Sequence, residues 1–443
     1  MKVRATSRHI WAVSFPVILA GLSEKIVEIT DIVFLGRYGT TELAAVGLAD
    51  AIYAVCLFLT LGLADGLQII IARRAGEGRL AEIGKVFNQG LYMLSATAVV
   101  FVVGIQLLSP YVTAALIRSH DIARAVDDFL QIFSYAMLFH GANLALSAFY
   151  VGISRTRVLI GATVVLALIN IVLDYILIFG HLGFPRLGIE GAAIASLAAE
   201  IGAFGVLLVY AIRQRFTQRY DLFRFGRWNG ILARKLLVVS YPVALDALVE
   251  TTRWLVFFLI IEQMGEAALA CANIVYSCYA LLLIPLEGFS ETICSMVSNL
   301  VGQQEPGRIG GLLRRAMSLS FVVVVPFLVL VFLLPEQVLA IFTSDTELIA
   351  NGANSLRVVV LAVAIVIPGE IFYSAVAGTG DTMATFLIEL ALTTCILSYA
   401  YVTAIRLGLP LETVWLAEVL GWLVCLTLSW AWLRAGRWRR LQV

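Results

Sequence analysis

Acidic side chains inside an apolar stretch are the first feature of this chain that could do chemistry. Residues 16–39 form a largely apolar stretch. A helix of this length, with a rise of about 1.5 Å per residue, crosses a bilayer. The stretch nevertheless includes Glu24, Lys25, Glu28 and Asp31. The three carboxylates are four and three residues apart, so a helix places them on one face. A charge in the bilayer centre costs at least about 2.5 kcal/mol, and such residues usually line an ion or substrate path. The alternative is an internal ion-pair cluster with Lys25 that only holds helices together.

A second polar pair lies later in the first half of the chain. Asn170 and Asp174 are four residues apart and share a helix face. Carboxylate and amide oxygens suit a hard cation such as Na⁺, and paired carboxylates shielded from water can hold a proton. Taken alone, Asn170 fits an interhelical hydrogen bond equally well. We predict a cation-binding and coupling site formed by the following residues, which fits either ion: Asp31, Asn170, Asp174, Glu28 and Glu24.

Charged residues also interrupt the apolar stretches of the second half. Asp246, Glu250 and Arg253 share one helix face, and Arg253 can neutralise one of the acids. More acids than bases remain, and a cavity with excess negative charge attracts a lipophilic cation. We predict contact with substrate or protons for a set of six residues: Glu250, Asp246, Glu287, Glu291, Glu370 and Arg253.

Motifs of enzymes and cofactor sites are not recognisable in the sequence. The GEG at 76–78 lacks the lysine and serine of a phosphate loop, and no metal-ligand spacing or paired nucleophile and base is present. We therefore expect no enzymatic activity and no cofactor, only a coupling ion. His140, close to Asn143, fits a proton relay, but a hydrogen-bonded core histidine is the simpler interpretation.

The composition identifies the elements that must position these residues. Of 443 residues, 61% are hydrophobic and 14% are charged, whereas soluble domains carry about a quarter charged residues. Such a chain is a membrane protein with many spans, and the lipid bilayer is its main partner. The net charge of +1 gives no reason to expect a nucleic-acid partner, because the basic residues are confined to short loops.

Apolar runs of about 20 residues predict an all-α integral membrane protein with twelve transmembrane helices. The predicted spans are 10–35, 43–72, 86–109, 128–153, 158–180, 189–213, 236–261, 268–300, 312–334, 355–377, 384–406 and 411–434. The loops on one side contain 23 Lys and Arg residues and those on the other side 6. The positive-inside rule therefore predicts that both termini are cytoplasmic.

The two halves of the chain repeat each other at a constant offset in residue number. The offset from Pro16 to Pro242 is also the offset from Glu24 to Glu250. It relates further pairs: Gly39 and Gly265, Leu43 and Leu269, Tyr53 and Tyr279, Gly62 and Gly288, Asp65 and Glu291, and Gly76 and Gly302. Because each half has an even number of spans, both enter from the same side, which predicts a parallel repeat. We expect an N-lobe at 1–213, a basic cytoplasmic linker at 214–235 and a C-lobe at 236–443.

These features resemble the multidrug and toxic compound extrusion (MATE) family of cation-coupled transporters over essentially the whole chain. The similar stretches are TDIVFLG at 30, ELAAVGLAD at 42, LGLADGLQIIIARRAGEG at 61, NIVLDYILIFG at 170, GIEGAAIAS at 188, YPVALDALVE at 241 and AGTGDT at 377. The resemblance implies a MATE-like fold of two pseudo-symmetric six-helix lobes. It also implies H⁺- or Na⁺-driven antiport that exports amphipathic, mainly cationic drugs or toxic organic compounds by alternating access.

The resemblance assigns roles to particular positions. Asp31 is similar to the acidic residue of the family's N-lobe cation site, and Asn170 with Asp174 to its NxxxD pair. Glu250 is similar to a seventh-helix glutamate, while Glu370 lies about one turn from the position of the tenth-helix acid. Glu24, Lys25, Glu28 and Arg253 depart from the pattern. We expect a monomer in the cell membrane.

A flippase for a lipid-linked oligosaccharide or peptidoglycan precursor is the alternative function. Related exporter families share two six-helix halves, and Lys25 and Arg253 could bind a pyrophosphate.

Overall fold

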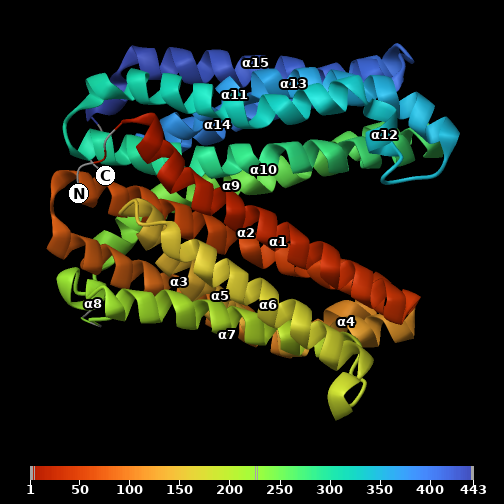
Figure 1. The fold of residues 1–443 in the computed structure, drawn as a ribbon, viewed down its shortest axis with the longest axis horizontal. Helices are drawn as coiled ribbons and strands as arrows, with labels where there is room; N and C mark the ends of the chain where they lie inside the picture. Colours follow the sequence, from red (N-terminus) through yellow and green to blue (C-terminus); the bar gives the residue numbers. More distant parts are fainter. Residues whose placement is uncertain (1–2, 4, 225, 227, 441–443) are drawn as a thin grey trace. The chain divides into compact units, whose positions relative to one another are not determined.

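The computed structural model describes residues 3, 5–224, 226 and 228–440, and these residues form helices joined by loops, with no strand among them (Figure 1). The long helices are α1 (Ser7–Tyr38), α2 (Thr40–Glu77), α3 (Leu80–Leu116), α4 (His120–Phe133), α5 (Ala136–Gly152), α6 (Arg157–Phe179), α7 (Ile189–Arg213), α9 (Gly230–Glu262), α10 (Glu266–Gly302), α11 (Ile309–Leu333), α13 (Thr346–Gly378), α14 (Thr382–Tyr401) and α15 (Leu411–Ala435). The short ones are α8 (Phe216–Arg219), α12 (Pro335–Leu339), the π-helix η3 (Val402–Arg406), and the 3₁₀ turns η1 (His181–Gly183), η2 (Pro306–Arg308) and η4 (Arg437–Arg440).

Most of these helices satisfy the requirements for a membrane span. Within the described residues, ten are long and apolar enough to cross a membrane, and the bent pair α4–α5 makes an eleventh span. The one remaining predicted span, 236–261, corresponds to α9, whose apolar stretch contains Asp246, Glu250 and Arg253. The predicted all-helical membrane fold is confirmed, because each predicted span has a helix at its place in the chain.

The predicted single span at 128–153 is divided in the structure. It begins earlier, at His120, and bends by 50° between α4 and α5. The Gln106 side chain donates to the Gln131 carbonyl (2.6 Å) and to Ser134 Oγ (3.0 Å) at the bend. This side chain inserts where the helical hydrogen bonds are interrupted, a usual cause of a sharp bend.

Local sequence signals explain where the helices end. Gly78 and Gly180 follow α2 and α6 in the left-handed conformation, with φ of 77° and 74°, which favours glycine. Asp345 begins α13 by accepting hydrogen bonds from the backbone N–H groups of Glu347 (2.9 Å) and Leu348 (3.2 Å). This cap extends α13 beyond the predicted span, which began at residue 355.

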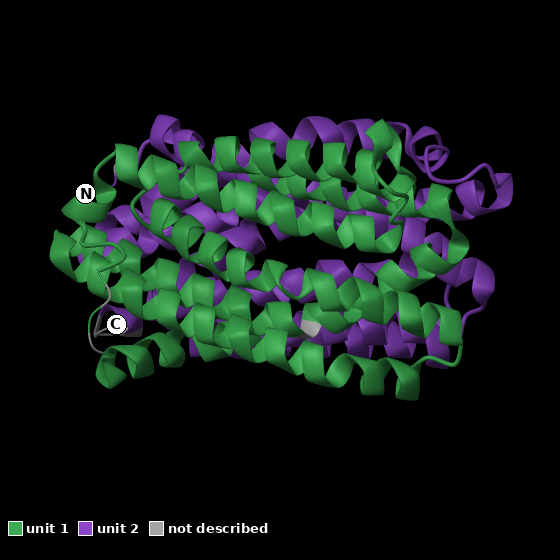
Figure 2. Ribbon diagram, turned by 90° about the horizontal axis from the view of Figure 1, so that it is seen from below, with its two compact units in different colours: residues 1, 19–244 green, residues 2–18, 245–443 purple. Residues whose placement is uncertain are grey.

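The chain divides into two compact units, shown in green and purple in Figure 2. The first unit contains Leu19–Ala244, and the second contains the segment that ends at Ile18 together with the chain from Leu245 onwards. The chain passes from one unit to the other after Ile18 in α1 and after Ala244 in α9, in each case two residues after a proline. The two boundaries are related by the same offset as the sequence repeat. The predicted lobe and linker boundaries at 213 and 236 therefore remain a prediction, since α1 and α9 each contribute to both units.

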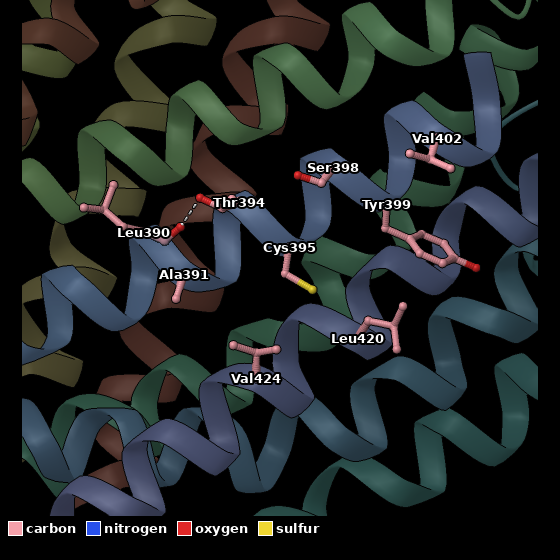
Figure 3. Close-up of a pocket in the computed structure, with 9 residues that line it drawn as sticks. All are labelled: Leu390, Ala391, Thr394, Cys395, Ser398, Tyr399, Val402, Leu420 and Val424. Carbon is pink, nitrogen blue, oxygen red and sulfur yellow. Dashed lines mark hydrogen bonds between the residues drawn. The ribbon is translucent and has the colours of Figure 1, made fainter. Parts of the chain in front are cut away.

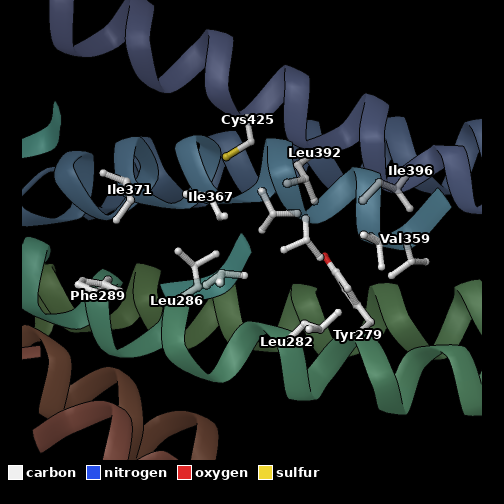
Figure 4. Packing of buried hydrophobic residues seen from close by; sticks show 14 of the residues in the cluster. Tyr279, Leu282, Leu286, Phe289, Val359, Ile367, Ile371, Leu392, Ile396 and Cys425 are labelled. Atoms are coloured by element: carbon white, nitrogen blue, oxygen red, sulfur yellow. The ribbon is translucent and has the colours of Figure 1, made fainter. Parts of the chain in front are cut away.

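Apolar side chains fill the core of the second unit. Figure 4 shows buried side chains of α10, α13, α14 and α15 that point toward one another. The labelled residues are Tyr279, Leu282, Leu286, Phe289, Val359, Ile367, Ile371, Leu392, Ile396 and Cys425. Gly421 on α15 allows this packing, because a Cβ there would lie 2.4 Å from Cγ1 of Ile396 on α14. Glu389 on α14 and Glu418 on α15 both form ion pairs with Arg253.

In the first unit, α6 and α7 are similarly close. A Cβ at Gly191 of α7 would lie 2.8 Å from the carbonyl carbon of Leu177 on α6. Because only glycine avoids this overlap, Gly191 sets the distance between the two helices. The polar residues of α6 can then reach those of α7.

Side chains of α3 hold the segment that follows α8. Asn88 Nδ2 donates to the carbonyls of Asp221 (3.0 Å) and Arg224 (3.2 Å), and its Oδ1 accepts from the Phe223 N–H (2.8 Å). Tyr92 adds a hydrogen bond from its hydroxyl to the Gly226 carbonyl (3.1 Å). This part of the predicted linker is therefore held against α3.

Candidate functional site

The first unit brings three of the predicted residues into direct contact. The Asn170 amide nitrogen donates to Asp31 Oδ1 (3.0 Å) and to Asp174 Oδ2 (3.1 Å), while its oxygen accepts from Ser196 Oγ (3.3 Å). This amide orientation is the one that satisfies all its neighbours. Asn170 and Asp174 lie one turn apart on α6, Asp31 on α1 and Ser196 on α7. Three helices thus converge on one amide.

The two carboxylates share the neutral Asn170 amide as a hydrogen-bond donor. Asn170 is 1% exposed and Asp174 is fully buried, and Asp174 Oδ1 has no hydrogen-bond partner among the described residues. A buried acceptor without a partner is costly. Charges at Glu28 and Asp50 interact with Asp31 as well. The arrangement therefore fits a proton or a small hard cation that binds between the carboxylates.

The other two acids of the first helix lie apart from this trio. Glu28 pairs with Lys25 at 2.6 Å, and both side chains are about half exposed, at 54% and 47%. Glu24 is exposed and interacts electrostatically with His140 and Glu200 rather than with Asp31. The structure thus places Asp31, but not Glu24 or Glu28, in contact with Asn170 and Asp174.

His140 takes part in a second polar cluster of the first unit. Its Nδ1 lies 2.9 Å from Glu200 Oε1, and Asn143 Nδ2 donates to Glu200 Oε2 (2.6 Å) and to the Glu200 carbonyl (3.0 Å). Glu200 lies one turn after Ser196 on α7. His140 is thus hydrogen-bonded to a glutamate, an arrangement that fits both a structural histidine and a proton relay.

Arg253 organises the charges of the second unit. Its Nη1 lies 3.3 Å from Glu418 Oε1, its Nε 3.5 Å from Glu389 Oε1, and its Nη2 3.8 Å from Glu250 Oε1. Its guanidinium also stacks on the Trp254 ring, 5.0 Å from the centroid. Glu250, one of the acids on the same helix face as Arg253, makes the longest of the three ion pairs and is 57% exposed.

The remaining predicted acids of the second unit have separate partners. Tyr373 donates its hydroxyl to Asp246 Oδ1 (2.6 Å). Ser290 donates to Glu370 Oε1 (2.5 Å), and Ser374 to the same oxygen (3.2 Å).

Glu287 and Glu291 both lie on α10, where Glu287 is exposed and Glu291 is half buried. Neither is among the three carboxylates that pair with Arg253 in the described part of the chain.

The sequence interpretation missed four acids that the fold places in these clusters. Asp50 and Glu200 belong to the first unit, and Glu389 and Glu418 to the second. None of the four has a second charged residue one turn away in its span. Only the rule that an intramembrane charge is functional by default could have selected them.

The second unit also contains a shallow apolar groove between α14 and α15 (Figure 3). The groove has a volume of about 770 Å³ and is lined by Leu390, Ala391, Thr394, Cys395, Ser398, Tyr399, Val402, Leu420 and Val424. The Thr394 hydroxyl donates to the Leu390 carbonyl (2.7 Å), so it is already engaged. The described lining includes none of the charged residues above, and the groove is not the candidate ion site.

The chain is similar in sequence to known transporters. The family model described as MatE matches residues 16–176 and 242–402, two segments that are again related by the offset of the sequence repeat. A protein of Thermotoga maritima named "Probable multidrug resistance protein NorM" is 24% identical over 432 residues, which cover 96% of this chain and 92% of that protein.

Solved structures share the fold. One described as the outward-facing conformation of a multidrug resistance MATE family transporter of the MOP superfamily has a TM-score of 0.87 at 19% identity, and covers 97% of this chain and 95% of its own. A MOP superfamily transporter from Pyrococcus furiosus, whose structure is described under the words "reverse polarity of binding pocket suggests different function", has a TM-score of 0.88 at 19% identity with the same coverage.

Proposed function

Because this chain belongs to the MatE family of membrane transporters, we propose that it exports amphipathic, mainly cationic drugs or toxic organic compounds in exchange for H⁺ or Na⁺. The observation that carries the proposal is the Asn170 amide held between the carboxylates of Asp31 and Asp174. The name of the Thermotoga maritima relative, a probable multidrug resistance protein, points to the same class of substrate.

In this proposal, the coupling ion neutralises the two carboxylates. Asn170 fixes their positions by donating to one oxygen of each, and Ser196 fixes the amide by donating to its oxygen. Asp174 Oδ1, buried and without a partner among the described residues, is the oxygen that gains most from a bound ion. When the ion leaves, two carboxylates close together repel each other. That difference in free energy lets the ion bias one conformation over another, as alternating access requires.

Substrate contact is assigned to the acids of the second unit. Glu250, at 57% side-chain exposure, is the most accessible member of the Arg253 cluster. Trp254 follows Glu250 by one turn of α9, and an exposed carboxylate with an aromatic ring on the same helix face suits a lipophilic cation, which gains charge pairing and cation–π contact. Asp246, Glu287, Glu291 and Glu370 remain candidates for the same role.

The proposal includes an orientation in the cell membrane. The 23 to 6 distribution of loop Lys and Arg residues supports cytoplasmic termini. We infer that one chain is sufficient for transport, since each compact unit carries a polar cluster made from its own helices.

Transport by the purified chain in proteoliposomes tests this function. An imposed proton or sodium gradient should drive movement of an organic cation such as ethidium, and only one of the two gradients should do so. Vesicles containing Asp31→Asn protein provide the control. If neither gradient moves any of a broad panel of cationic dyes and drugs, export of this class of compound is wrong.

The flippase alternative is less well supported. It relied on Lys25 and Arg253 as ligands for pyrophosphate, but Lys25 pairs with Glu28 and Arg253 is enclosed by carboxylates. A fluorescent lipid-linked pyrophosphate in the same vesicles distinguishes the two. Its translocation without any movement of organic cations would favour the flippase.

A further inference from the structure

The buried charges around Arg253 in the second unit do not balance. Arg253 is 3% exposed, Glu418 is fully buried and Glu389 is 7% exposed. Glu250, the third acid of the cluster, has a side chain that is 57% exposed, so its charge is not a buried one. One buried cation thus faces two buried carboxyl groups from α14 and α15. A buried carboxylate without its own counter-charge is strongly disfavoured.

Glu418 uses the charge of Arg253. Its Oε1 faces Arg253 Nη1 at 3.3 Å, and its Oε2 accepts from the Tyr279 hydroxyl (3.1 Å) and from Trp422 Nε1 (3.2 Å). Three donors from three helices therefore surround one carboxylate. Hydrogen bonds to the charged form stabilise it, so Glu418 is the permanent partner of Arg253.

Glu389 is held much less completely. Its Oε1 accepts from the Thr393 hydroxyl at 3.2 Å, on its own helix. Arg253 Nε lies 3.5 Å from the same oxygen, but that distance and direction do not make a hydrogen bond. Both contacts are made to Oε1, and one of the two partners, the Thr393 hydroxyl, is uncharged. Glu389 is therefore the carboxyl group of the pair whose charge is not matched.

We propose that Glu389 is an exchangeable proton-binding site of the second unit, distinct from the Asp31–Asn170–Asp174 site of the first. Its negative charge is balanced either by an O–H bond formed with a proton taken from water or by an incoming organic cation. When the cation enters, the O–H bond breaks and the proton returns to water, so that no other bond changes. The charged and titratable groups that interact with Glu389 are Arg253, Asp246 and Glu250 from α9, Tyr373 from α13 and Cys425 from α15. Around these, Glu418 and Tyr279 interact with Arg253, and Glu370 interacts with Asp246.

This neighbourhood favours a cation. Arg253 is the cation among these neighbours, and Glu418 already neutralises it. Asp246 and Glu250 add negative charge near Glu389. The exchange of the Glu389 proton for an organic cation rests on the proposed function. Proton binding by Glu389 does not, because it can be measured without any substrate.

Infrared spectroscopy of the full chain in lipid nanodiscs tests the site. A protonated carboxyl group gives a C=O band that shifts in heavy water and disappears when the proton is lost. Across a pH titration, Glu389→Gln protein should lose one such pH-dependent band relative to the wild type. Glu418→Gln should keep a titrating band but move its midpoint to lower pH, because the charge of Arg253 is then free to pair with Glu389.

A second variant protects the test against a folding defect. Thr393→Val removes only the neutral donor to Glu389, so the band should remain while the pH of its midpoint moves. If the titrating band persists in Glu389→Gln, or if Thr393→Val leaves its midpoint unchanged, the assignment is overturned. Failure of the wild type to transport any cation would instead refute the proposed function and leave the infrared result standing.

Discussion

Replacing Asp31 by asparagine tests the ion site most directly. The change keeps the shape of the side chain but removes its charge, and it weakens the hydrogen bond that Asp31 Oδ1 accepts from the Asn170 amide at 3.0 Å. A hydrogen bond to a charged group contributes about 1.5–3 kcal/mol. Since 1.4 kcal/mol corresponds to about a factor of ten in affinity, we expect binding of the coupling ion to fall at least about tenfold.

Asp174→Asn should have a similar effect, because its Oδ2 accepts from the same amide at 3.1 Å. The double variant should be little worse than either single one, since residues that act as one unit are not additive. Glu28→Gln is the matched control, one turn from Asp31 on the same helix. Its ion pair with Lys25 is about half exposed, and such pairs contribute only about 0–1 kcal/mol.

The assay is gradient-driven efflux from proteoliposomes with equal amounts of folded protein, checked by size-exclusion chromatography. Asp31→Asn and Asp174→Asn should lose most gradient-driven export, whereas Glu28→Gln should retain most of it. Wild-type rates in both aspartate variants would refute the ion site. Equal losses in all three would mean that the charged face of α1 acts as a whole.

The fold makes three further predictions. Reporters fused after Val443 and inserted in 214–235 should both be active on the cytoplasmic side; activity of both on the opposite side would reverse the topology. Asn88→Ala should lower the melting temperature and speed proteolysis of the segment after α8, because it loses three hydrogen bonds of about 1 kcal/mol each; unchanged cleavage would show that the segment is held otherwise. Gly191→Ala should reduce both stability and export, whereas Gly205→Ala on the same helix, with nothing within 4 Å of its Cβ, should be neutral; equal behaviour of the two would refute the close-packing argument.

The sequence predicted the helices well because the bilayer restricts the choices. A segment that spans it needs about 20 apolar residues and satisfies its own backbone hydrogen bonds. The predicted spans 189–213 and 411–434 therefore agree with α7 and α15 to within one residue. The bend between α4 and α5 was not predictable, because the apolar pattern continues through it and its cause is Gln106, in another helix.

The candidate site was predictable only where its residues repeat along one helix. Asn170 and Asp174 stand out because they are one turn apart. Glu389 and Glu418 do not, because their shared partner Arg253 is far away in the sequence and is brought to them by the packing of α14 and α15. Contacts between helices carry the chemistry here, and spacing within a helix reveals only part of it.

The internal repeat governs the backbone but not the chemistry of the two units. At the offset that relates Pro16 to Pro242, Asp31 in α1 corresponds to Phe257 in α9, which is fully buried in the apolar core of the second unit. In the opposite direction, Arg253 corresponds to Val27, a residue that cannot hold a carboxylate. Each unit therefore places the central charge of its polar cluster at a position that is apolar in the other, although Glu250 keeps an acidic counterpart in Glu24. The repeated scaffold thus holds two different buried charge sets. Under the two proposals made above, the first unit would bind its ion between two acids, while the second would hold a fixed arginine beside an exchangeable acid.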